Sequence, residues 1–304
     1  MGAVVDKREL IATVWPNTVV EETNLRVHIK SLRRALGESA TEGSYILNVP
    51  GRGYSFVGTL IPEAGAPHPV ESGATAQSRA TLPAPLTRMV GREATLATLV
   101  QLVPERRLVT IVGLGGVGKS TLALEVASRL ADSYPDGTHF VHLAAIGNAA
   151  LVAATIATEI GLTLSTDEPV SSLVAFLKRR HMLLVLDNCE HVIGAVAELA
   201  ESLLRGTDRL SILATSREPL GAAGEWQSRL QPLSIPPSDG AITAAQARTY
   251  GAVELFVERA VTRDCTFVLT DANAPMLCDI CRRLDGIPLA IELVAARLDP
   301  PSTR

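Results

Sequence analysis

Short apolar runs alternate with amphipathic helical segments through the larger part of the chain. Four strong runs and a weaker fifth lie at residues 108–112, 138–143, 182–186, 210–214 and 228–233. Strands that are apolar on both faces are typical of a parallel sheet covered by helices on each side. After residue 244 the pattern is only helical. We therefore predict an α/β fold with a five-stranded parallel sheet and a C-terminal helical subdomain.

The first 60 residues have a different pattern. A short amphipathic helix over residues 7–15 ends before a proline, and a second helix over residues 22–36 is rich in Lys and Arg. Residues 45–49 and 54–57 then flank a Pro-Gly-Arg-Gly turn. This order predicts a helix-turn-helix followed by a β-hairpin wing, an arrangement with which proteins read DNA. A basic helix that is only solvated surface is the alternative.

The composition limits the classes of function. The 304 residues carry a formal net charge of −4, so DNA binding has to come from a local basic surface. The four cysteines lack the spacing of a disulfide scaffold, which favours a reducing, cytoplasmic location. Cys278 and Cys281 fit the packed side of a helix better than a metal site. Charged residues near Met1 argue against a signal peptide, and the apolar stretch 151–162 is too short to span a membrane.

The segment Gly113–Thr121 carries the strongest chemical signal. It reads Gly-Leu-Gly-Gly-Val-Gly-Lys-Ser-Thr between an apolar run and a helical segment, which is the context of a phosphate-binding P-loop. Its backbone amides would bind phosphate oxygens, Lys119 would reach the β- and γ-phosphates, and Ser120 would bind Mg²⁺. The residues expected to contact a nucleotide here are Gly113, Gly115, Gly116, Val117, Gly118, Lys119, Ser120 and Thr121.

Two further apolar runs end in groups suited to a nucleotide site. The third run ends at Asp187, the expected second Mg²⁺ ligand, although an Asp that only caps the following turn is the alternative. Asn188 cannot act as a base, so hydrolysis is expected to be slow, while Glu190 would either orient the water or complement a helix dipole. Arg217 follows the fourth run and would read a terminal phosphate, unless it is a plain surface residue. The absence of an Asn-Lys-x-Asp element favours adenine over guanine.

The proline-rich stretch over residues 62–85 divides the chain. It contains five prolines among Ala, Gly, Ser and Glu and has no apolar period, which predicts an extended linker. The expected domains are a partial winged helix-turn-helix, a linker, a P-loop nucleotide-binding domain and a helical subdomain, at residues 1–60, 61–86, 87–235 and 236–304.

Five motifs, in this order, resemble the NB-ARC-type STAND ATPases over residues 88–300. They are Val90-Gly91-Arg92-Glu93, the P-loop, Leu186-Asp187-Asn188, Thr215-Ser216-Arg217-Glu218-Pro219-Leu220 and Leu284-Asp285-Gly286-Ile287-Pro288-Leu289-Ala290. The resemblance implies a nucleotide switch that binds ATP or ADP with Mg²⁺. It further implies that another strand lies between the P-loop strand and the strand of Asp187. The roles implied for single residues are an adenine border at Val90, Gly91 and Arg92, a base contact at Pro288, and a γ-phosphate sensor at Arg217.

The N-terminal segment resembles the winged-helix effector domain of OmpR/PhoB-type response regulators over about residues 4–58. The resemblance rests on residues 24–36 and on Val49-Pro50-Gly51-Arg52-Gly53-Tyr54. The residues that it implies as DNA contacts are His28, Lys30, Ser31, Arg33 and Arg34 on the recognition helix and Asn48 and Arg52 on the wing. No receiver domain accompanies this segment, so nucleotide state is expected to replace aspartyl phosphate as the control.

Both resemblances lead us to expect a chain that is truncated at both ends. OmpR/PhoB-type domains carry a small sheet and a first helix before the point that corresponds to Val4, so these first elements are expected to be missing. STAND ATPases continue after the point that corresponds to Arg304. There they add a winged-helix domain with a Met-His-Asp-like motif that holds ADP, and a repeat domain that senses a ligand.

These features predict a cytoplasmic, DNA-binding transcriptional regulator controlled by an ATP/ADP switch with Mg²⁺. Its expected partners are double-stranded DNA and further copies of itself in a nucleotide-dependent assembly, with no role for a membrane. The catalytic groups of a slow ATPase would be Lys119, Asp187, Glu190 and Arg217. Two alternatives stay open: a P-loop ATPase or small-molecule kinase without a DNA-binding role, and a truncated remnant without function.

Overall fold

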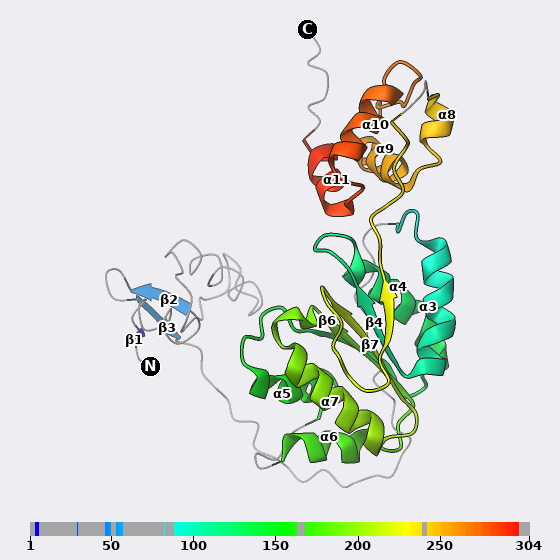
Figure 1. The fold of residues 1–304 in the computed structure, drawn as a ribbon. Coiled ribbons are helices and arrows are strands. Elements are labelled where there is room, and N and C mark those ends of the chain that lie inside the picture. The colour runs from blue at the N-terminus through cyan, green and yellow to red at the C-terminus, as the bar shows by residue number, and fades with distance from the viewer. Residues whose placement is uncertain are drawn as a thin grey trace. The chain divides into compact units, whose positions relative to one another are not determined.

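The computed structural model describes residues 4–5, 29, 46–49, 53–56, 82, 88–162, 168–238 and 242–297. The chain forms two compact units, Met1–Ala74 and Thr75–Arg304, and each has its own architecture (Figure 1). Apart from Leu82, the predicted linker at residues 61–86 lies outside the described residues.

In the N-terminal unit the described residues form a three-stranded antiparallel sheet of order β1-β3-β2. The strands β2 (Ile46–Val49) and β3 (Gly53–Phe56) pair as the predicted hairpin. The strand β1 (Val4–Val5) pairs with the other side of β3. It was not predicted, because two apolar residues are too few to show an alternation.

One of the predicted DNA contacts, Asn48, lies among the described residues. Ile29 is helical, in agreement with the predicted second helix, and Asn48 lies in β2 opposite Tyr54. The other predicted contacts lie outside the described residues, and they are His28, Lys30, Ser31, Arg33, Arg34 and Arg52.

The larger unit contains a five-stranded sheet of order β5-β6-β7-β4-β8 in which every pair is parallel. The strands are β4 (Leu108–Val112), β5 (Thr138–His142), β6 (Met182–Asp187), β7 (Leu210–Ser216) and β8 (Trp226–Arg229). The predicted parallel sheet is therefore confirmed. The strand β7 lies between the P-loop strand β4 and the strand β6 of Asp187, as the STAND resemblance implied.

The fifth strand is displaced from its predicted position at residues 228–233. β8 begins at Trp226 and ends at Arg229, and it forms an edge whose residues are mostly exposed. An edge strand of this kind carries no apolar run to reveal it. The apolar residues that suggested the prediction, Leu230 and Leu233, are buried after the strand has ended.

Helices cover both faces of this sheet (Figure 1). On one face lie α3 (Glu93–Arg106) and α4 (Lys119–Leu130), and on the other lie α5 (Val152–Glu159), α6 (Pro169–Leu177) and α7 (Ile193–Gly206). The residues of β6 alternate between the two cores, because Leu184 and Leu186 pack with α5–α7 while Leu183 and Val185 pack with α3 and α4. This alternation explains why β6 is an uninterrupted apolar run. Single 3-10 turns lie at Ala131–Ser133, Ala149–Leu151 and Cys189–His191.

The C-terminal part of the described chain is helical, as predicted. It consists of α8 (Ala244–Ala247), α9 (Gly251–Arg263), α10 (Ala274–Arg283) and α11 (Pro288–Ala295). These helices share a core of their own, in which Cys278 and Cys281 are fully buried. Both cysteines are free, in keeping with the packing role predicted for them. None of the described helices is long and apolar enough to cross a membrane.

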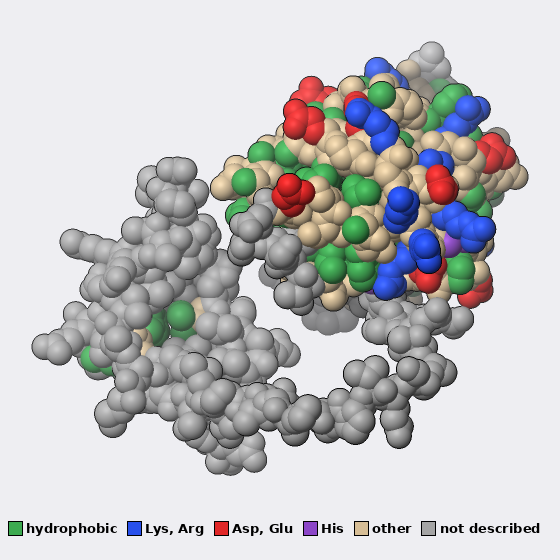
Figure 2. Space-filling model, turned by 90° about the horizontal axis from the view of Figure 1, so that it is seen from below, with side chains coloured by type: hydrophobic (Ala, Val, Ile, Leu, Met, Phe, Trp, Pro, Cys, Tyr) green, Lys and Arg blue, Asp and Glu red, His purple; other side chains and the backbone are tan. Residues whose placement is uncertain are grey.

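Basic residues follow the ends of α3, α6 and α7. Figure 2 shows several Lys and Arg side chains on one face of the larger unit. Cations at helix C-termini complement the negative end of the helix dipole and bind the free carbonyls. Arg107 is the clearest case: it donates to the carbonyl oxygens of Thr207 (2.5 Å), Leu210 (3.1 Å) and Leu204 (3.3 Å). It thereby joins the turn before β4 to the end of α7 and the start of β7.

Candidate functional site

The loop between β4 and α4 is fixed from within by Lys119. Gly116 and Gly118 have φ angles of +75° and +94°, a left-handed conformation that glycine adopts without strain. The Lys119 ammonium donates to the carbonyl oxygens of Gly113 (2.8 Å) and Leu114 (3.0 Å). A β-carbon at Gly118 would meet no atom within 4 Å, so the space beside this residue is open.

Lys119 is a buried cation, with only 7% of its surface exposed. Burial lowers the pKa of its ammonium, the carboxylates of Glu190 and Asp187 oppose this shift, and the charge of Arg217 adds to it. The net pKa lies below the ordinary value because burial outweighs the carboxylates. A phosphate group beside Lys119 would stabilise its charged form, so the loop favours an anionic ligand.

The carboxylate of Asp187 lies between side chains from both neighbouring strands. Thr215 on β7 donates its hydroxyl to Oδ1 at 2.6 Å, and His142 on β5 donates from Nδ1 to Oδ2 at 3.0 Å. The same Thr215 hydroxyl accepts the backbone amide of Asn188 at 3.0 Å. Asp187 itself is 1% exposed. Its orientation is therefore fixed by three adjacent strands.

Glu190 and Arg217 form an ion pair at the same edge of the sheet. The Arg217 Nε donates to Glu190 Oε1 at 3.1 Å. The Arg217 side chain is 64% exposed, whereas that of Glu190 is 11% exposed. Within the described part of the chain, the second carboxylate oxygen of Glu190 is buried and has no hydrogen-bond partner. A buried acceptor of this kind is costly unless a donor satisfies it.

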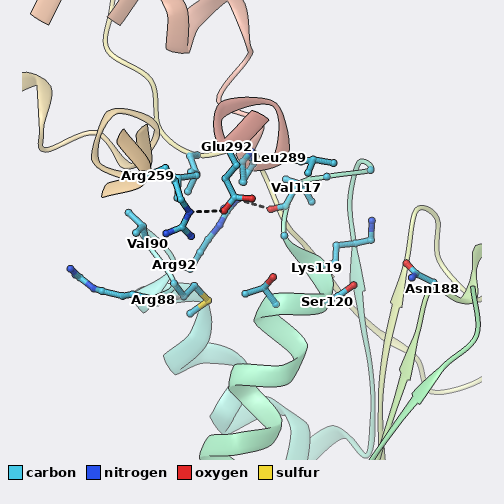
Figure 3. Close-up of a pocket in the computed structure, with 18 of the residues that line it drawn as sticks. Arg88, Val90, Arg92, Val117, Lys119, Ser120, Asn188, Arg259, Leu289 and Glu292 are labelled. Atoms are coloured by element: carbon cyan, nitrogen blue, oxygen red, sulfur yellow. Dashed lines mark hydrogen bonds and ion pairs between the residues drawn. The ribbon is translucent and has the colours of Figure 1, made fainter. Parts of the chain in front are cut away.

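A cavity of about 330 Å³ lies beside these groups, between the P-loop and the helical subdomain (Figure 3). Its walls come from the segment before α3, the P-loop and first turn of α4, the loops after β6 and β7, and the helices α9 and α11. Arg92 lies in this wall and donates to the carbonyl oxygen of Val117 at 3.2 Å. Burial lowers the pKa of the Arg92 guanidinium.

The helical subdomain touches the P-loop directly. The amide of Leu289, in the first turn of α11, donates to the carbonyl oxygen of Gly116 at 3.1 Å. A β-carbon at Gly116 would lie only 2.9 Å from Leu289 Cβ, so glycine is required for this close approach. A β-carbon at Gly91 would likewise lie 3.2 Å from Gly251 Cα at the start of α9.

The cavity brings together most residues that the sequence suggested for a nucleotide. Those that line it are Val90, Arg92, Gly115, Gly116, Val117, Gly118, Lys119, Ser120, Thr121, Glu190, Arg217 and Pro288. Three others do not line it. Gly113 contributes its carbonyl to Lys119, Gly91 packs against α9, and Asp187 is enclosed by Thr215 and His142.

Sequence reasoning missed the polar groups that the helical subdomain contributes. Arg259 on α9 and Glu292 on α11 line the cavity and form an ion pair. Glu292 follows Pro288 by four residues and so lies on the same helix face, a spacing that could have revealed it. Arg259 and His142 belong to none of the motifs, and only the fold brings them to the site.

These groups fit the phosphates of a nucleotide. The open space at Gly118 and the ammonium of Lys119 suit phosphate, while the partnerless oxygen of Glu190 suits a water or hydroxyl donor. The two ends of the cavity also differ in polarity. Arg217 and Glu190 belong to the phosphate end, whereas Met89, Val90 and Leu255 supply apolar surface for a base.

Two family models match separate parts of the chain. Residues 1–56 match the model described as "Transcriptional regulatory protein, C terminal", and residues 104–217 match the model described as "AAA domain". The chain joins a transcriptional-regulatory domain to a P-loop ATPase-type domain. This result confirms the predicted combination of a winged-helix domain with a P-loop domain.

Longer regulators contain a similar segment. A "Putative HTH-type transcriptional regulator" of Mycobacterium tuberculosis is 46% identical over 201 residues, which cover 65% of this chain and 21% of that protein. The "Regulatory protein AfsR" of Streptomyces griseus is 29% identical over 234 residues, which cover 72% of this chain and 22% of that protein. The chain thus spans about a fifth of the length of these relatives.

Solved structures are similar to parts of the chain at low identity. A Drosophila ORC structure bound to DNA has a TM-score of 0.50 at 13% identity and covers 68% of this chain and 60% of that chain. A STAND protein with a tetratricopeptide repeat sensor from Pyrococcus horikoshii has a TM-score of 0.42 at 17% identity. The match covers 70% of this chain and 30% of that chain.

Proposed function

We propose that this chain acts in a DNA-binding transcriptional regulator whose P-loop domain is an ATP/ADP switch of the NB-ARC-type STAND class. The observation that supports the switch is the hydrogen bond from the Leu289 amide to the Gly116 carbonyl. Because the cavity is lined by both the P-loop and α11, one nucleotide would contact the sheet and the helical subdomain at once. A ligand that binds two arrangements of these parts unequally shifts the population between them.

Except for those of Asp187 and Gly91, the proposed nucleotide-binding roles follow from position in the cavity. The P-loop amides and Lys119 would bind the phosphates, and Ser120 and Asp187 would hold Mg²⁺, which neutralises phosphate charge. Val90, Arg92 and Pro288 would border the base, with Gly91 permitting the close approach of α9.

Arg217 and Glu190 would distinguish ATP from ADP. The exposed guanidinium is held only by Glu190 among the described residues, so a γ-phosphate would compete for it. Loss of this partner would leave both carboxylate oxygens of Glu190 available to orient a water. Asn188, which lines the same cavity, cannot act as a base, so slow turnover is part of the proposal.

On the N-terminal side, the proposal assigns residues 1–60 to DNA recognition. The family match over residues 1–56 and the β2–β3 hairpin support a winged helix. The second helix, with His28, Lys30, Ser31, Arg33 and Arg34, would enter the major groove, while Asn48 and Arg52 on the wing would contact the adjacent groove or backbone. ATP-dependent self-association would bring several such domains to repeated sites.

Fluorescence anisotropy of a labelled duplex tests this proposal. The full chain is titrated across a salt series with Mg²⁺ plus ATP, ADP or no nucleotide. We expect salt-sensitive binding whose affinity differs at least several-fold between ATP and ADP. Arg33→Ala and Arg52→Ala should weaken binding and flatten the salt dependence.

Three results would contradict it. Binding that is identical in all nucleotide states would refute the switch. Tight nucleotide binding without any DNA binding, together with steady phosphoryl transfer, would favour a P-loop ATPase or kinase. A broad melt that no nucleotide changes would favour a remnant without function.

A further inference from the structure

An ion pair between two helices of the helical subdomain faces the middle of the cavity. Arg259 on α9 donates from Nε to Glu292 Oε1 on α11 at 3.0 Å, and its Nη1 contacts Glu258 Oε1 at 3.0 Å. The Arg259 side chain is 16% exposed, and that of Glu292 is 39% exposed. Both residues line the cavity, whereas Glu258 does not.

Glu292 lies between the two ends of this cavity. Figure 3 shows its carboxylate between Val90 with Arg259 on one side and Val117 with the start of α4 on the other. A nucleotide with phosphates on the P-loop and its base against Val90 places its sugar in that interval. Glu292 is therefore the carboxylate that the sugar would meet first.

We propose that Glu292 accepts hydrogen bonds from the ribose hydroxyls and so makes the site specific for ribonucleotides, with Arg259 as its positioning residue. This inference rests on the proposed nucleotide site. A carboxylate only accepts hydrogen bonds, and the 2′- and 3′-hydroxyls are the sugar's donors. One oxygen of Glu292 is bound by Arg259, which leaves the other for the sugar.

The surroundings make a carboxylate compatible with a polyphosphate ligand. Arg259 offsets the charge of Glu292, and Arg92 brings another guanidinium into the same cavity. The pairing with Arg259 also restricts the Glu292 rotamers, so less side-chain freedom is lost on binding. A site that provides an acceptor for a hydroxyl discriminates against the analogue that lacks it.

Calorimetric titration of the full chain with Mg²⁺ and ATP, 2′-deoxy-ATP, 3′-deoxy-ATP or 2′,3′-dideoxy-ATP tests this role. Charge-assisted hydrogen bonds of this kind predict that ATP binds at least tenfold more tightly than dideoxy-ATP. In Glu292→Ala the two affinities should agree within about twofold, because ATP binding weakens while dideoxy-ATP binding is retained. Glu292→Gln, which keeps the shape and one acceptor, should fall between them.

Glu258→Gln is the matched control. It removes the same charge beside the same arginine but outside the cavity, so it should keep the wild-type preference for ATP. The proposal is overturned if the wild type binds dideoxy-ATP as tightly as ATP, or if Glu292→Ala keeps the tenfold preference. Absence of binding by every nucleotide, in a chain that melts cooperatively, would refute the proposed nucleotide site as well.

Discussion

Replacing Gly116 by alanine adds a single β-carbon to the contact between the P-loop and α11. The new β-carbon would lie 2.9 Å from Leu289 Cβ and 3.2 Å from Leu289 Cδ2. The Cδ2 atom belongs to a half-exposed side chain and can turn away, but Leu289 Cβ is fixed to the helix. The helix α11 must therefore move, and the 3.1 Å bond from the Leu289 amide to the Gly116 carbonyl lengthens or breaks.

Two terms set the size of the effect. The left-handed backbone at Gly116 costs alanine about 1 kcal/mol relative to glycine. The steric term for a β-carbon forced into a packed contact is about 1–3 kcal/mol, and opening of α11 limits it to the lower part of that range. We expect a loss of about 2 kcal/mol in the free energy of unfolding, which corresponds to about 4–8 °C in Tm for a unit of this size.

The variant Gly118→Ala separates the backbone cost from the steric cost. Gly118 also has a left-handed backbone, with φ of +94°, but a β-carbon there would meet nothing within 4 Å. This control should show the backbone cost of about 1 kcal/mol alone. Hydrogen exchange without nucleotide should be roughly tenfold faster at the Leu289 amide in Gly116→Ala and unchanged in Gly118→Ala.

Equal loss of stability in the two variants, with equal protection of the Leu289 amide, would refute the reasoning. It would show that α11 does not rest on the P-loop in solution and that the Gly116 carbonyl is not its anchor.

Three other changes probe separate parts of the structure. Lys119→Ala should abolish the rise in Tm that ATP produces, because the cation that would bind the phosphates is lost; a thermal shift equal to that of the wild type would contradict the site. Arg107→Ala should lower the free energy of unfolding by about 2–3 kcal/mol in urea titrations, because it leaves carbonyls of Thr207 and Leu210 without their charged donor. Burial lowers the pKa of His139, so the unfolded chain binds the proton more readily and stability should fall as the pH drops below about 6.5. His139→Gln should flatten this dependence when unfolding is compared at pH 5.5 and 7.5, and an unchanged slope would point to another group.

Much of the fold could be predicted because the sheet is buried on both sides. Strands such as β6 must be apolar at every position, and a run of this kind is visible in the sequence. The edge strand β8 and the two-residue β1 lack that signal, since an exposed edge needs no apolar residues.

Some residues of the candidate site could likewise be predicted from the sequence, and others could not. The P-loop and Arg217 are contiguous with strand ends, so their clustering at one sheet edge follows from topology alone. Arg259 and Glu292 reach the cavity only because the helical subdomain packs against it, and a tertiary contact between distant segments leaves no local pattern. His142 is similar, since its contact with Asp187 depends on β5 lying beside β6.

The path of the chain between the sheet and the helical subdomain restricts how the two can move. The amide of Leu230 is bound to Val112 in β4, whereas the amide of Leu233 is bound to Gly286 beside α11. Only Gln231 and Pro232 lie between these anchors, and the proline ring fixes one of the few torsions available. If the helical subdomain rotates relative to the sheet, it would therefore rotate about this short and stiff segment. The range of such a motion would be restricted by Gln231 and Pro232, which lie between Leu230 beside Gly113 of the P-loop and Leu233 in the cavity wall.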